Sequence, residues 1–140
     1  MKLTLKDKSN YIKGLLILIG KDKIIRKEER ELLMDISAIL GFDQNFIKEA
    51  IDEILINKYI IEEPPVFSKK EIAKAFIKDG IKLACSDKEL HLYELNWLKS
   101  VVEKNKLESG FGLAEFEKFQ KSVPNKIPAR TDFEISKLVQ

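Results

Sequence analysis

The 140-residue sequence has one cysteine, one histidine and one tryptophan, with only four prolines and six glycines. A single cysteine excludes an internal disulfide and a cysteine cluster that could hold a structural metal. With a single histidine, acid–base chemistry would have to rely on carboxylates. No phosphate-binding loop, dinucleotide-binding fingerprint or nucleophile elbow occurs in the chain. The sequence therefore lacks the common catalytic and nucleotide-binding motifs.

The chain also lacks a strong net charge and a long apolar run. Lysine and arginine total 25 against 23 aspartate and glutamate, which gives no general attraction to nucleic acid or to an anionic membrane. The apolar run Leu15–Ile19 is far shorter than the roughly 20 residues that span a bilayer. The opening "MKLTLKDKSN" has no apolar core of the kind that a secretory signal needs. We therefore expect a cytoplasmic protein with no integral membrane segment and no nucleic-acid partner.

What the sequence does contain is apolar residues at helical spacing along nearly its whole length, with no alternating pattern of the kind that predicts a strand. We predict one all-α domain, residues 1–140, built as a bundle of six or seven helices. Ser68 with Glu71, and Thr131 with Glu134, fit the capping box, and Asp43 fits an N-cap. The predicted helices lie at about 7–20, 26–40, 44–58, 69–85, 91–106, 112–122 and 132–139.

The chain resembles itself at an offset of 65 residues, which aligns 11–58 with 76–123 without a gap. Eight of the 48 pairs are identical, and the placement of the apolar residues is the stronger signal. Leu16, Leu18, Leu33, Ile36, Phe46, Ile51 and Ile54 fall on Ile81, Leu83, Leu98, Val101, Phe111, Phe116 and Phe119.

This offset predicts two tandem three-helix units related by pseudo-twofold symmetry. Unit one covers about 11–58 and unit two about 69–123. A connector, 59–68, joins them, and Pro64 and Pro65 hold it extended. A C-terminal connector and short helix, 124–140, complete the domain.

The two units share a loop pattern: Asp, Lys, any residue, an apolar residue, three variable residues, then Glu. It places Asp22 and Glu29 in one loop, and Asp87 and Glu94 in the other. In one interpretation these carboxylates cap helices and meet the positive end of the helix dipole. In the other, the loops approach each other and the four carboxylates bind a divalent cation such as Ca²⁺, Mg²⁺ or Mn²⁺. His91 is then an outer candidate ligand, and otherwise a surface residue.

The stretches "GKDKIIRKEERELL" and "CSDKELHLYELNWL" resemble the signature of the TerB-like, or tellurite-resistance, domain family. In that family an alanine-rich helix end runs into Asp-Gly, an apolar residue and then a Glu on the next helix. The resemblance spans residues 11–123. It implies an all-helical bundle with acidic clusters, divalent-cation binding, and a role in bacterial stress and tellurite resistance. Lys23 and Lys88 replace the family's Gly, and a lysine ammonium could substitute for the cation.

Together these features predict a non-catalytic TerB-like binding domain in a stress-response or tellurite-resistance system. Its partner would be an unidentified protein, and the chain would be a monomer or a weak dimer. A metal-dependent hydrolase using the carboxylates and an interaction scaffold with no ligand are the alternatives. We expect Cys85 to be a small core residue rather than a nucleophile, Trp97 to lie at the core boundary, and Phe111, Phe116 and Phe119 to lie in the core.

Overall fold

A computed structural model describes residues 3–20, 25–56, 63–85, 91–122 and 133–139. Over these residues the chain forms seven helices and no strand, which confirms the all-α prediction. Among the described helices, none has both the length and the apolar character that crossing a membrane requires. The helices are α1 (Leu5–Ile19), α2 (Lys27–Ile39), α3 (Gln44–Ile56), α4 (Lys70–Ala84), α5 (Leu92–Lys104), α6 (Phe111–Ser122) and α7 (Ile135–Leu138).

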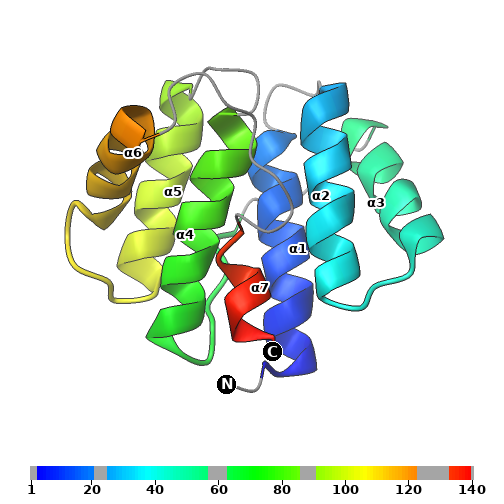
Figure 1. The fold of residues 1–140 in the computed structure, drawn as a ribbon, viewed down its shortest axis with the longest axis horizontal. Coiled ribbons are helices and arrows are strands. Elements are labelled where there is room, and N and C mark those ends of the chain that lie inside the picture. The colour runs from blue at the N-terminus through cyan, green and yellow to red at the C-terminus, as the bar shows by residue number, and fades with distance from the viewer. Residues whose placement is uncertain (1–2, 21–24, 57–62, 86–90, 123–132, 140) are drawn as a thin grey trace.

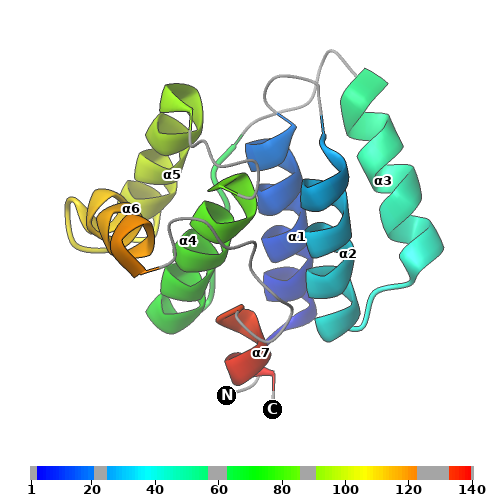
Figure 2. The same ribbon diagram turned by 45° about the horizontal axis from the view of Figure 1, so that its top comes forward.

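The helices α1 and α4 lie side by side at the centre of the molecule (Figure 1). Helices α2 and α3 flank α1 on one side, and α5 and α6 flank α4 on the other (Figures 1 and 2). The short α7 packs against α4 and α2 at the end of the bundle where both termini lie. Residues far apart in sequence therefore meet along the central pair.

Two glycines let the central helices approach each other closely. A Cβ added to Gly14 on α1 would lie 2.7 Å from the ring of Phe76 on α4. A Cβ on Gly80 of α4 would lie 3.0 Å from the side chain of Leu18 on α1. Glycine inside a helix costs about 1 kcal/mol relative to alanine. Here that loss is offset by the close packing of α1 on α4.

An aromatic cluster fills the space between the central helices and the connector. The ring of Phe76 lies 5.3 Å from those of Tyr11 and Phe67 and 6.1 Å from that of Trp97, measured between centroids. Trp97 is buried, so it belongs to the core itself rather than to its predicted edge. The connector residue Phe67 is also buried, which ties the start of α4 to the core.

The helix starts follow the sequence expectations with two exceptions, at α4 and α7. Asp43 accepts a hydrogen bond from the amide of Asn45 at 2.8 Å and so caps α3 as predicted. The predicted cap at Ser68 is wrong: the N-cap of α4 is Lys69, and it has no side-chain cap bond. Ser68 instead donates both its amide and its hydroxyl to Asp7, which leaves its side chain no role in capping α4. Thr131 lies outside the described residues, but Glu134, predicted in the first turn of the last helix, is instead the N-cap of α7, which begins at Ile135.

The predicted core aromatics of the third helix of unit two are only partly buried. Phe111, Phe116 and Phe119 on α6 pack against the edge of the main core. In unit one, Phe46 is 58% exposed, and its ring lies on that of Phe42 with 6.4 Å between centroids.

Candidate functional site

The glutamates of the twin loops lie in the first turns of α2 and α5, as the sequence predicts. Both are buried, with 4% of each residue exposed. Glu29 accepts the backbone N–H of Arg26 at 3.0 Å, and Glu94 accepts the backbone N–H of His91 at 3.0 Å. One oxygen of each carboxylate therefore caps the start of its own helix.

The other two predicted ligands, Asp22 and Asp87, lie outside the described residues. His91 is the N-cap residue of α5, and its ring stacks on that of Tyr93 at 5.3 Å between centroids. In the described part of the chain, no group of three or more His, Cys, Asp or Glu residues is placed to hold a metal ion. The four-carboxylate cation site thus stays a prediction. Cys85 is half-buried against the core, at the C-cap of α4.

Asp79 is a fully buried carboxylate that the sequence analysis did not single out. It accepts hydrogen bonds from the Tyr11 hydroxyl at 2.5 Å, the Glu134 amide at 2.7 Å and the Ile135 amide at 3.0 Å. Burial raises the pKa of Asp79 to about 6, although these hydrogen bonds and the nearby Lys82 ammonium favour the charged form. Asp79 therefore fastens α1, α4 and α7 together.

The spacing of apolar residues in the sequence indicates that Asp79 is buried. Asp79 falls on the same face of α4 as Ile72, Phe76 and Leu83, at the spacing that marks a buried helical stripe. A carboxylate among core residues needs hydrogen-bond donors, because a buried charge without them is strongly unfavourable. Tyr11 supplies one of these donors. Burial is the main cause, and the charge of Asp79 the second, that raises the pKa of the Tyr11 hydroxyl well above its ordinary value.

A second buried carboxylate, Asp7, holds the connector against the start of α1. It accepts the amide of Thr4 at 3.2 Å, and the amide and hydroxyl of Ser68 at 2.9 and 2.6 Å. Burial opposes the charged form of Asp7, but the hydrogen bonds from Ser68 and Thr4 outweigh it and lower its pKa. The end of the connector is thereby fixed on α1.

The connector is held from α5 as well. The side-chain amide of Asn105 donates to the carbonyl oxygens of Pro65 at 2.8 Å and Val101 at 2.9 Å, and its oxygen accepts the Phe67 amide at 2.9 Å. On the α1 side, Asn10 donates to the carbonyl oxygen of Val66 at 3.3 Å. Residues 63–68, which form neither helix nor strand, are therefore held as a wall beside α1.

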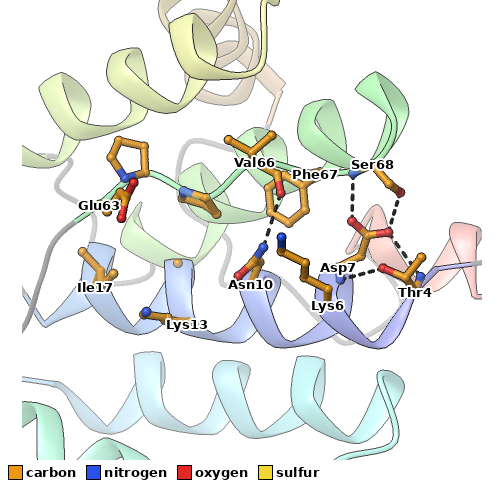
Figure 3. A pocket seen from close by; sticks show the side chains of 13 residues that line it. Thr4, Lys6, Asp7, Asn10, Lys13, Ile17, Glu63, Val66, Phe67 and Ser68 are labelled. Carbon is orange, nitrogen blue, oxygen red and sulfur yellow. Dashed lines mark hydrogen bonds between the residues drawn. The ribbon is translucent and has the colours of Figure 1, made fainter.

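A groove of about 450 Å³ lies between this wall and α1 (Figure 3). We call it the connector groove; residues 63–68 line one side, and residues of α1 together with Thr4 line the other. Lys6 and Lys13 both line it, are both exposed, and lie seven residues apart on one face of α1. Neither forms an ion pair with a carboxylate of the described residues.

The buried polar side chains of the described residues all hydrogen-bond within the fold. They are Asp7, Glu29, Ser37, Asp79, Glu94 and Asn105. The hydroxyl of Ser37 bonds a carbonyl oxygen of its own helix, and the other five groups hold helix ends and the connector in place. The connector groove, in contrast, presents two lysines to solvent. Comparison with known proteins identifies no family, because no protein-family model, curated protein or solved structure matches the chain.

Proposed function

We propose that this chain is a non-catalytic binding domain of the TerB-like type, acting in a stress-response or tellurite-resistance system. Binding is favoured over catalysis because the buried carboxylates are all engaged in hydrogen bonds that hold the fold together. Asp7, Asp79, Glu29 and Glu94 each accept hydrogen bonds from groups of the fold itself. A catalytic carboxylate must instead be directed at a substrate. The connector groove is the surface on which such a domain would receive a partner.

The TerB-like part of the proposal draws support from the helix bounds. Adding 65 to the bounds of α1, 5–19, gives 70–84, the bounds of α4; the same shift takes α2, 27–39, to α5, 92–104. The third helices match less well, because α3 begins at Gln44 and α6 at Phe111. We propose that the units are tandem repeats related by a pseudo-twofold axis. An experimental structure in which α1–α3 does not superpose on α4–α6 would count against this.

A deletion strain tests the proposed role. Cells that lack the gene should be more sensitive to tellurite than their parent, and a plasmid copy should restore growth. An inducible promoter then separates binding from catalysis. A binding protein acts stoichiometrically, so protection should rise in proportion to the amount of protein up to the native level.

Two outcomes contradict the proposal. If deletion leaves growth unchanged under tellurite, peroxide and metal stress, the stress role is wrong. If a small fraction of the native protein level already restores full growth, the protein turns over a substrate and the non-catalytic assignment is wrong.

A further inference from the structure

We propose that residues 133–139 form a displaceable strap, and that the surface beneath it receives the same segment of a second copy of this chain. We call this surface the strap site; it lies on α4 and α2 and includes Asp79 and Lys82. Exchange of the two straps would give a dimer. This inference concerns how the chain associates with itself, so it is tested separately from the proposed stress role.

The strap contacts its site in the way that a bound peptide does. Asp79 accepts the amides of Glu134 at 2.7 Å and Ile135 at 3.0 Å, so one carboxylate satisfies two successive backbone N–H groups. The Glu134 carboxylate lies 3.6 Å from the Lys82 ammonium, in a pair whose side chains are only 26% and 19% exposed. Phe133 and Ile135 are fully buried. Two apolar anchors, an acidic residue between them and two backbone donors therefore define the segment that this site accepts.

The strap depends on this site for its order. Helix α7 has four residues, and a helix that short has no stability of its own. It packs against α4 and α2, and Figures 1 and 2 show it apart from α6, the helix that precedes it in the chain. Terminal segments open at a lower free energy than the core of a domain. The strap can therefore leave its site while α1 to α6 keep their contacts with one another.

A second copy is the occupant that the contacts favour. Exchange of identical segments keeps every contact between strap and site and requires no new surface, which makes it a low-cost route to dimers. The ten residues 123–132 separate the strap from α6 and reach about 35 Å at most when fully extended. A strap tethered in this way competes at an effective concentration on the order of 1 mM. The wild type should therefore be mainly monomeric at micromolar concentrations, with a dimer dissociation constant of about 1 mM.

Charge reversal tests the exchange by sedimentation equilibrium of the full-length protein. In Lys82→Glu the strap site repels its own strap, and in Glu134→Lys the strap is repelled by its own site. Mixing the two variants restores the attraction only between chains, because each strap then meets a site of opposite charge. Reversal of this partly buried pair should change strap binding about fivefold at each site. We therefore expect the mixture to dimerise at least tenfold more tightly than the wild type.

Three controls locate the effect in the strap. Each variant alone should dimerise no more tightly than the wild type, because its closed and exchanged forms carry the same repulsion. A chain with both substitutions restores the pair within itself and should match the wild type within twofold. Mixing Lys48→Glu with Glu117→Lys, at exposed positions on α3 and α6, introduces the same charges away from the strap and should leave dimerisation unchanged. The nearby charges of Asp79 and Lys137 are present in every arrangement and cancel from the comparison. Circular dichroism checks that every variant is folded.

A second measurement uses the unaltered protein and does not depend on the folding of the variants. In fluorescence anisotropy, a labelled peptide of residues 131–140 should bind the wild type with an apparent dissociation constant of about 1 mM, because it must displace the tethered strap. The same peptide with Phe133→Ala and Ile135→Ala lacks both apolar anchors and should bind at least tenfold more weakly.

Three outcomes overturn the inference. The peptide of residues 131–140 could show no saturable binding up to about 5 mM. The mixture of Lys82→Glu and Glu134→Lys could dimerise no more tightly than the wild type, or the control mixture could dimerise equally. The tellurite sensitivity of a deletion strain bears on the proposed function and on none of these results.

Discussion

Removing the Asp79 carboxylate should destabilise the protein because it fastens three helices at once. Asp79→Ala leaves the Tyr11 hydroxyl and the Ile135 amide, both on fully buried residues, without their acceptor. An unsatisfied buried donor costs about 1–3 kcal/mol. Part of this loss is offset because the variant no longer buries a carboxylate whose pKa is raised. We expect the free energy of unfolding at pH 7 to fall by about 2–4 kcal/mol.

Urea denaturation measures this loss by circular dichroism and by the fluorescence of Trp97, the only tryptophan, which lies in the core. Glu49→Ala, at an exposed position on α3, serves as the control and should change the free energy of unfolding by no more than about 0.5 kcal/mol. Tyr11→Phe and the double variant complete a thermodynamic cycle. Because the two side chains are in contact, their coupling should be about 1 kcal/mol or more.

The pH dependence gives an independent signature. The pKa of Asp79 is about 6 in the folded protein, above its ordinary value of 3.8, so the folded state binds the proton more tightly than the unfolded state. This contribution to stability is fully present below about pH 4 and is lost as the pH rises through about 6. Between pH 5 and pH 7, the wild type should therefore lose about 1 kcal/mol more than Asp79→Ala. Two results together would refute the role of Asp79 in joining the three helices. The difference in unfolding free energy between the wild type and Asp79→Ala would not change with pH, and the double-variant cycle would show no coupling between Asp79 and Tyr11.

Two further predictions concern the other carboxylates. Asp7→Asn should lower the free energy of unfolding at pH 7 by about 1–2 kcal/mol. Because the folded-state pKa of Asp7 is lowered, its contribution is present above about pH 4 and lost as the pH falls further, so urea denaturation should show the wild-type advantage shrinking from pH 5 to pH 3. If the twin loops bind a cation, calorimetry with Ca²⁺, Mg²⁺, Mn²⁺ and Zn²⁺ should show heat and thermal melts should shift upward. Asp22→Asn with Asp87→Asn should abolish both effects and Asp35→Asn neither, whereas a silent wild type at millimolar cation would leave the carboxylates as helix caps.

The parts of the fold that the sequence predicts best are those fixed by neighbouring residues. Helices α1 to α6 begin and end within two residues of their predicted positions. Apolar periodicity and capping act over three or four residues, so a single sequence displays them directly. The caps made by Asp43, Glu29 and Glu94 are of this local kind.

What the sequence did not predict depends on distant partners. Ser68 looks like a helix cap, but Asp7, 61 positions earlier, takes its donors. Asp79 lies on the apolar face of α4, but the donors that it needs, the Tyr11 hydroxyl and the amides at the start of α7, come from distant parts of the sequence. Phe46 is exposed because α3 turns the line of Ile47, Ile51 and Ile54 toward the core. The adjacent position points about 100° away from that line on a helix.

The contacts that attach α7 affect how fast the protein folds and whether its two halves could fold separately. The contacts made by Asp79 join residues 68 positions apart on one side and 55 and 56 positions apart on the other. Closing such long loops costs conformational entropy before the stabilising contacts form. Contacts between residues so far apart in the sequence therefore slow folding. Neither unit contains all the members of this cluster, because Tyr11 comes from the first, Asp79 from the second, and Ile135 from beyond both. A fragment cut at the connector would therefore keep either the hydroxyl or the carboxylate, and each half would be left with a polar group in its core that only the rest of the chain can satisfy.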